Sequence, residues 1–104
     1  MAERLVAIYG RRLREARENR GISQTDLGIA VRLDESSAGS RISRYENGIH
    51  QPKLGMQQLF ARTLELPLAY FYAEDDKLAQ LIANFGRRNK PTEKRVKTKK
   101  KSRK

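Results

Sequence analysis

The 104-residue sequence contains no cysteine and only one histidine, His50. Without cysteine the chain forms no disulfide framework and offers no thiol for chemistry. A single histidine also excludes the usual zinc sites, which take several nitrogen or sulfur ligands. Long apolar runs are missing too, including from the first residues, MAERLVAIYGRR. We therefore expect no secretory signal, no membrane span and a cytoplasmic location.

Groupings of catalytic residues are equally scarce. No nucleophile–base pair and no metal-binding cluster is visible, and His50 has no obvious partner. The sequence therefore does not indicate an enzyme, and we expect no cofactor, no metal ion and no small-molecule ligand.

The net charge of +11 is concentrated at the C-terminal end of the chain. Residues 86–104 carry 11 Lys or Arg against one acid, whereas residues 1–85 carry 12 against 11. We expect residues 87–104 to be a disordered Lys/Arg-rich tail, because they lack apolar periodicity. Such a segment binds polyanions through counterion release without reading a sequence. It could follow a DNA groove, raise non-specific DNA affinity or merely keep the chain in solution.

The rest of the sequence predicts an all-α fold, a compact bundle of five to six short helices. No sustained apolar–polar alternation occurs, and the one Asn-Gly dipeptide, Asn47-Gly48, ends a helical pattern. Ser23 and Asp34 are good N-caps. The predicted helices run from Glu3 or Ile8 to Asn19, Gln24 to Arg32, after Asp34 to Glu46, Lys53 to Glu65, Pro67 to Tyr72, and onward from residues 74–76.

Apolar residues at helical spacing predict the buried faces. In the first helix the inward positions are Leu5, Tyr9, Leu13 and Ala16, and in the second they are Leu27, Ala30 and Val31. The fourth helix is expected to bury Met56, Leu59, Phe60 and Leu64.

Residues 23–48 carry the pattern that points to a function. Ser23-Gln24 opens one short helix, and a second bears Ile42-Ser43-Arg44-Tyr45-Glu46 and ends at Gly48. Two short helices at a steep angle allow the second to lie in the major groove of DNA while the first crosses the backbone. Over about residues 8–72 the order and spacing of these positions resemble the lambda-repressor-like (Cro/XRE-type) helix-turn-helix family.

One departure from the common family pattern is a longer connection. Ile42 would there follow Ser23 by about four fewer residues, whereas residues 33–41 form a longer turn and helix start here. This variant resembles a subgroup that includes restriction–modification controller proteins. The resemblance implies a DNA-binding helix-turn-helix domain, which we place over residues 1–73. The apolar stripe and the composition add a C-terminal helix for dimerisation over 74–86 and the tail over 87–104.

Base contacts are expected on the second helix of the motif. Arg44 lies two residues after Ile42, so it points away from the core and can make a bidentate contact to guanine. Arg41 could reach a base or a phosphate. The serines form a small surface suited to close approach, with DNA shape adding specificity. The predicted base contacts are Ser36, Ser37, Ser40, Arg41 and Arg44.

Phosphate contacts are expected at the start of the first motif helix and around the end of the second. Gln24 resembles the family position that contacts phosphate, where a helix N-terminus also presents N–H groups. The predicted set is Gln24, Ser43, Tyr45, Asn47, His50 and Lys53. Arg17 and Glu46 resemble a family pair that forms a partly buried salt bridge and orients the reading helix. The alternative for this pair is two unrelated surface charges.

A single short helix reads too few base pairs for an operator, so we expect a homodimer on a two-fold site. The C-terminal segment offers the apolar surface, part of which must also complete the monomer core. The predicted dimer interface is Tyr70, Phe71, Leu78, Leu81, Ile82 and Phe85.

The sequence therefore predicts a sequence-specific transcriptional regulator that binds a palindromic double-stranded DNA operator as a dimer. It leaves open a repressor or an activator, and a restriction–modification controller or a prophage-type regulator. The alternative is an antitoxin-like interaction protein whose basic tail or C-terminal helix holds a toxin, with DNA binding as a secondary activity.

Overall fold

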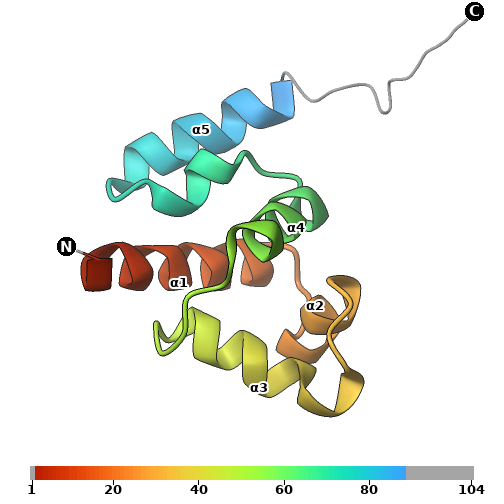
Figure 1. Cartoon of the computed structure of the whole chain (residues 1–104). Coiled ribbons are helices and arrows are strands. Elements are labelled where there is room, and N and C mark those ends of the chain that lie inside the picture. Colours follow the sequence, from red (N-terminus) through yellow and green to blue (C-terminus); the bar gives the residue numbers. More distant parts are fainter. Residues whose placement is uncertain (1, 89–104) are drawn as a thin grey trace, which may run out of the picture.

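The structure is a computed structural model that describes residues 2–88 (Figure 1). In chain order it contains α1 (Ala2–Asn19), α2 (Gln24–Ala30), α3 (Glu35–Glu46), α4 (Leu54–Leu64), the 3-10 helix η1 (Leu68–Tyr72) and α5 (Asp76–Arg88). These residues form no β-strand, which confirms the predicted all-α bundle. None of the described helices is both long and apolar enough to span a membrane. The predicted tail lies, from residue 89 onward, outside the described residues.

Local capping explains where the two motif helices begin and end. The Ser23 hydroxyl accepts a hydrogen bond from the Asp26 backbone N–H at 2.9 Å. The Asp34 carboxylate accepts one from the Ser36 N–H at 3.3 Å. Both bonds satisfy amides that have no partner within the helix. At the far end of α3, Gly48 takes a φ of 72°, the left-handed conformation that glycine adopts without strain.

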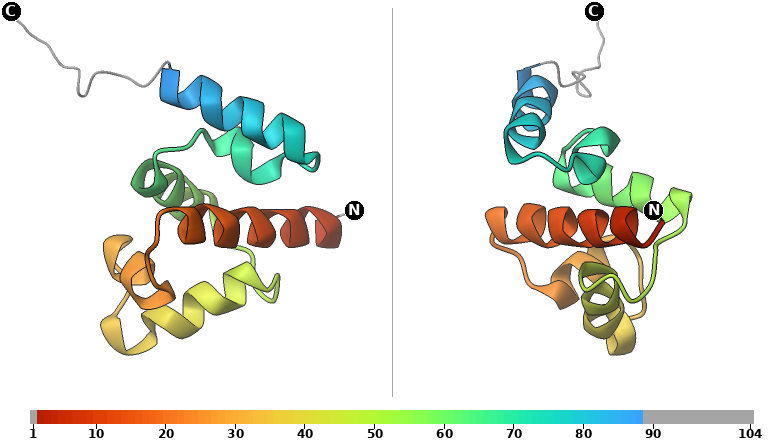
Figure 2. Two further views of the ribbon diagram at one scale, coloured as in Figure 1. Left: turned by 180° about the vertical axis from the view of Figure 1, so that it is seen from behind. Right: turned by 90° about the vertical axis from the view of Figure 1, so that its left-hand side faces the viewer.

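One hydrophobic core joins the helices, and they lie around it in a fixed order. Figures 1 and 2 show α1 and α4 in the middle, with α2 and α3 on one side and η1 and α5 on the other. Leu5, which the periodicity places on the buried face, is 45% exposed because it lies beyond this core. Each element contributes buried side chains to it, among them Tyr9, Leu13, Leu27, Ile42, Phe60, Leu64 and Phe71.

The helices α2 and α3 approach each other closely at Gly28. A Cβ atom at this position would lie 2.5 Å from the Cβ of Ala38, so only glycine permits the contact. The sequence predicts Ala30 as an inward residue, but Ala30 is exposed and Gly28 is buried in its place. The prediction is wrong because apolar periodicity gives no weight to a residue without a side chain.

The C-terminal elements divide their apolar residues differently from the prediction. Tyr70 and Phe71 are 5% and 0% exposed, and the Phe71 ring lies 5.3 Å from the ring of Tyr9. They complete the core of the monomer, so the prediction that they form a dimer interface is corrected. In α5 the buried side chains are Ala79 and Ala83, with Ile82 partly buried. The larger residues Leu78, Leu81 and Phe85 are 48%, 65% and 65% exposed.

Candidate nucleic-acid interface

The helix α3 buries one side and leaves the other open. Ala38, Ile42, Tyr45 and Glu46 face the core. Ser36, Ser40 and Arg44 are exposed and follow one another at intervals of four residues, so they share a face of the helix. In Figures 1 and 2, α3 lies at the outer edge of the molecule, at the end opposite α5. The open face of α3 is therefore free to enter a groove.

Three serine hydroxyls in the first half of this helix donate to nearby residues of the chain. Ser40 Oγ donates to the Ser37 carbonyl at 3.1 Å, and Ser37 Oγ donates to the Asp34 carbonyl at 3.4 Å. Ser36 Oγ donates to the Asp34 carboxylate. Because the hydroxyl protons are used internally, the oxygens present lone pairs outward. Such acceptors match the exocyclic amino groups of adenine and cytosine in the major groove.

The two arginines of α3 occupy different sides of the helix. Arg44 lies about 200° around the helix from buried Ile42, so it points directly outward. Its side chain is exposed and makes no hydrogen bond or ion pair with another residue between 2 and 88, although its backbone carbonyl accepts from Ile49 at the end of α3. Arg41 instead donates from Nη2 to the Tyr45 hydroxyl at 2.9 Å, with its Cζ 5.9 Å from the ring centroid. This bond holds Arg41 on the side of α3 that faces α4, because Tyr45 packs against Phe60 of α4.

Four of the predicted phosphate contacts, Gln24, Ser43, Tyr45 and Asn47, have hydrogen-bond partners inside the protein. Gln24 Nε2 donates to Glu46 Oε1 at 3.0 Å. Asn47 Nδ2 donates to the carbonyl and the hydroxyl of Ser43 at 2.8 and 3.3 Å, which closes the end of α3. His50 and Lys53 lie exposed in the connection from α3 to α4. Of the predicted set, these two are the exposed residues whose side chains bond to no other described residue.

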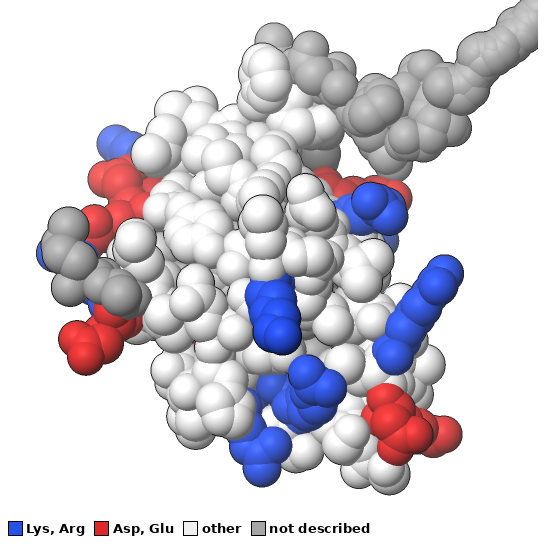
Figure 3. All heavy atoms as spheres, in the orientation of Figure 1, with Lys and Arg blue, Asp and Glu red and all other residues white. Residues whose placement is uncertain are grey.

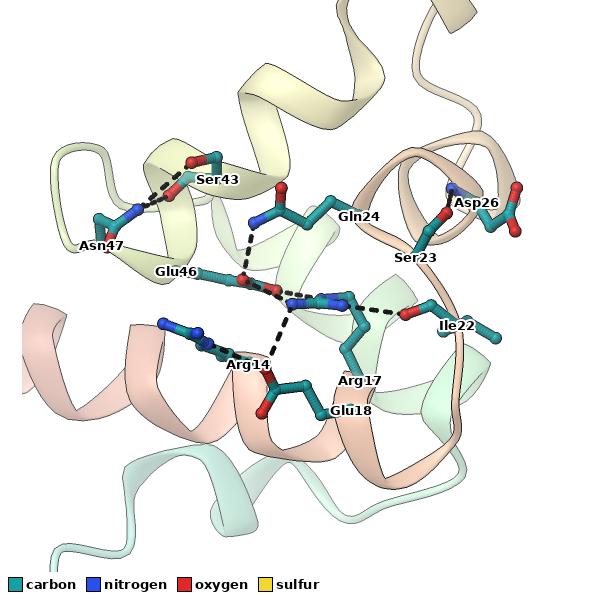
Figure 4. A network of polar contacts seen from close by, with 10 residues as sticks. All are labelled: Arg14, Arg17, Glu18, Ile22, Ser23, Gln24, Asp26, Ser43, Glu46 and Asn47. Carbon is teal, nitrogen blue, oxygen red and sulfur yellow. Dashed lines mark hydrogen bonds and ion pairs between the residues drawn. The ribbon is translucent and has the colours of Figure 1, made fainter.

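Glu46 is the centre of a polar network that joins three elements (Figure 4). Arg17 Nε donates to Glu46 Oε2 at 2.6 Å and Arg17 Nη2 donates to Oε1 at 3.2 Å. The Glu46 side chain is only 2% exposed. Hydrogen bonding to Glu46 raises the pKa of Arg17 against the opposing effect of burial, so the arginine keeps its charge. The network fixes the end of α3 and the start of α2 on α1.

The sequence indicates the Arg17–Glu46 pair but not the third partner, Gln24. Nothing in the sequence distinguishes a glutamine that binds a phosphate from one that turns inward. A second tie, also missed, is Gly10 of α1, where a Cβ would lie 2.5 Å from the Glu46 carbonyl oxygen. The close approach of α1 to the end of α3 therefore requires glycine at this point.

Charges are distributed unevenly between the two ends of the molecule. Every ion pair between described residues involves an arginine from residues 4–20. Arg32, Arg41, Arg44 and Lys53 have no acidic partner within residues 2–88. Figure 3 shows Lys and Arg side chains below the middle of the visible face and a mainly uncharged surface above them. The cations near α3 are thus available to phosphate groups.

Known proteins resemble the chain both in sequence and in structure. The profile of a family described as a helix-turn-helix domain matches residues 8–69. A solved structure titled "Crystal structure of transcriptional regulator BswR" is 40% identical in sequence, with a TM-score of 0.72. The match covers 74% of this chain and 76% of that chain. No curated protein sequence matches the chain.

Proposed function

Because the chain belongs to the helix-turn-helix domain family, we propose that it regulates transcription by binding one DNA sequence as a homodimer on a two-fold operator. The observation that carries the proposal is the open face of α3. It presents Arg44 without an internal partner, on a helix that the Arg17–Glu46–Gln24 network holds in place. A side chain that recognises a base needs this combination of freedom at its tip and rigidity at its backbone.

In this proposal α3 lies in the major groove, where Arg44 contacts a base and Arg41 contacts a phosphate. Arg44 donates both arms of its guanidinium to O6 and N7 of a guanine. Ser36 and Ser40 accept from base amino groups nearby. Arg41 and the Tyr45 hydroxyl, together with His50 and Lys53, bind phosphates along the groove and set the register of the protein without reading sequence.

Two features support the proposed homodimer: the size of the reading helix and the surface of α5. A helix of 12 residues contacts few base pairs, so two copies are needed for operator-grade specificity. On α5, Leu78, Leu81 and Phe85 lie about 100°, 160° and 120° around the helix from buried Ala79. This stripe is therefore on the side of α5 that is turned away from the core. In the proposed dimer a second copy covers it, with both α3 helices directed at the same DNA.

We propose that the regulated genes belong to a restriction–modification system or to a prophage. The long connection before Ile42 supports this assignment. In the structure part of this connection is helical, because α3 begins at Glu35.

Selection of binding sites from a random DNA library tests the function. The full chain is expected to enrich one two-fold sequence. Arg44→Ala is expected to lose about tenfold or more of the preference for guanine at one position of each half-site. Arg62→Ala removes an exposed cation from α4 and serves as the control with unchanged preference. Enrichment of no sequence by the full chain would contradict the proposal, and an unchanged preference in Arg44→Ala would contradict the role of Arg44.

A further inference from the structure

Arg12 is the largest side chain that the core buries completely, with 1% of it exposed. Charged residues are rarely buried to this extent unless they are fully paired. Arg12 Nε donates to the Ala73 carbonyl at 2.8 Å, and Nη2 donates to the Glu74 carbonyl at 3.1 Å and to Asp76 Oδ1 at 2.9 Å. Ala73 and Glu74 lie in the connection between η1 and α5, and Asp76 is the first residue of α5. Arg11 Nη2 also donates to the Glu74 carbonyl at 3.2 Å and Arg4 pairs with the Glu74 carboxylate, but Arg12 is the buried guanidinium of α1 that reaches α5 itself.

Neighbouring groups strengthen this tie. Arg12 Nη1 donates to Glu15 Oε1 at 2.9 Å, and the Tyr70 hydroxyl donates to the same oxygen at 2.7 Å. The Arg12 Cζ lies 5.9 Å from the Tyr70 ring centroid. Burial lowers the pKa of Arg12, but the hydrogen bonds to Glu15 and Asp76 outweigh it and raise the pKa overall. Arg12 thus remains charged, and its bonds remain charge-assisted.

Apolar packing holds α5 much less firmly. The helix buries the single methyl groups of Ala79 and Ala83 and part of Ile82, while its larger apolar residues face outward. Gly86 adds a close contact, since a Cβ there would lie 2.7 Å from Pro67 Cδ. Small side chains permit this approach but leave few contacts that resist a change of angle. The orientation of α5 relative to α1 therefore depends on the bonds that Arg12 makes.

The same helix α1 also carries the reading helix. Arg17, five residues after Arg12, binds Glu46 at the end of α3. A continuous helix of 18 residues links the two arginines rigidly. We propose that Arg12 is a positioning residue that fixes α5 relative to α3 and thereby sets the distance between operator half-sites that the homodimer accepts. This inference rests on the proposed function, because it needs a dimer that forms through α5.

A rigid dimer accepts one spacing of half-sites. Each inserted base pair moves one half-site along the DNA and rotates it about the DNA axis, out of reach of the second α3. If α5 were free to change its angle, one dimer would tolerate several spacings. The inference therefore concerns the selectivity for spacing and not the affinity for a single half-site.

The first experiment measures the angle of α5 directly in the full chain. Because the sequence has no cysteine, Ala30→Cys on α2 and Lys77→Cys on α5 introduce two spin labels at exposed positions. Labelled protein is diluted into unlabelled protein so that only distances within one chain are measured. The doubly labelled protein without further substitutions is expected to give one narrow distribution of distances between the labels. Arg12→Lys, which keeps the charge but loses the planar fork, is expected to broaden it.

Two further variants protect this measurement against a simple folding defect. Asp76→Ala removes an acceptor whose side chain is 86% exposed, so the core stays intact, and it is expected to broaden the distribution as well. Arg14→Lys changes an arginine of α1 that pairs with Glu18, and it serves as the control with an unchanged distribution. Narrow distributions in both Arg12→Lys and Asp76→Ala would overturn the inference, whether or not the protein dimerises.

The second experiment measures spacing. Operators are made with zero, one or two base pairs inserted between the half-sites. A DNA fragment with a single half-site serves as the reference. The wild-type protein is expected to lose about tenfold or more of its affinity on the first insertion, because the second half-site is out of reach. Arg12→Lys is expected to lose far less, with its affinity for the single half-site unchanged. An Arg12→Lys protein that keeps the wild-type dependence on spacing would overturn the inference. Wild-type binding as a monomer would instead contradict the proposed dimer, and the label distances would still decide whether Arg12 holds α5.

Discussion

Two arginines of α1 and one arginine of α3 have the same side chain in opposite surroundings. Arg12 and Arg17 on α1 are 1% and 11% exposed in their side chains, and each donates to several oxygens of other elements. Arg44 on α3 is exposed and makes no ion pair with a described residue. The first two hold the protein together, and the third is the side chain that we propose contacts a base. An arginine is thus assigned to stability or to recognition by the acceptors that the fold places around it.

Among these arginines, replacing Arg12 is expected to change the stability of the protein most. Arg12→Met is expected to lower the free energy of unfolding by about 3 kcal/mol, because the buried hydrogen bond to the Ala73 carbonyl and the bonds from Arg12 to Glu74 and Asp76 are lost. Urea unfolding followed by circular dichroism measures this. Arg14→Met, at an exposed position of the same helix, is the control and should stay within about 0.5 kcal/mol of the wild type. Equal effects of the two changes would show that burial of Arg12 contributes nothing.

Glu46→Gln tests the paired arginine nearest to DNA. Replacing the carboxylate leaves Arg17 with a neutral acceptor, so stability should fall by about 2 kcal/mol. Operator affinity should fall further than stability alone explains, because the end of α3 is then held less firmly. Fluorescence anisotropy with labelled operator measures affinity under conditions where the variant is fully folded. Glu35→Gln, exposed at the start of α3, is the control; an equal loss of affinity there would point to charge and not to positioning.

Arg41→Ala sharpens the distinction between the two arginines of α3. If Arg41 contacts a phosphate, affinity should fall by the same factor for all sequences. The slope of log affinity against log salt concentration should then decrease by about 0.9 for each contact, and therefore by about 1.8 for the two copies in the proposed dimer. Tyr45→Phe, which removes the hydroxyl that holds Arg41, should reduce affinity less and leave base preference unchanged. A shift in base preference in either variant would assign Arg41 to base readout instead.

The smallest expected effect concerns a polar group that lacks a partner in the core. Tyr9 is 1% exposed, and its hydroxyl bonds to no other described residue. Burial raises the pKa of this hydroxyl far above its ordinary value. Tyr9→Phe should therefore raise stability by about 1 kcal/mol, because an unsatisfied hydroxyl is removed. Tyr72→Phe is the matched control with the opposite sign, since its hydroxyl donates to Gln57 Oε1 at 2.7 Å. Thermal unfolding distinguishes the two.

Local sequence signals determined the helices and the position of the motif. Ser23 and Asp34 cap α2 and α3, and Gly48 follows the end of α3 in a left-handed conformation. These interactions join residues within one turn of each other, so they are present in the sequence itself. The face of α3 that Arg44 occupies also follows from helical spacing, since Ile42 is buried and Arg44 is exposed.

Only the tertiary structure decided which of several similar residues faces inward. Tyr70 and Phe71 are buried while Leu78 and Leu81 are exposed, because η1 packs against α1 and α5 contacts η1 through alanines. Gln24 turns toward Glu46, and Arg12 toward the start of α5, because acceptors 22 and 64 residues away in sequence lie beside them. A side chain's partners across such separations depend on how the helices pack. Spacing along one helix does not contain that information.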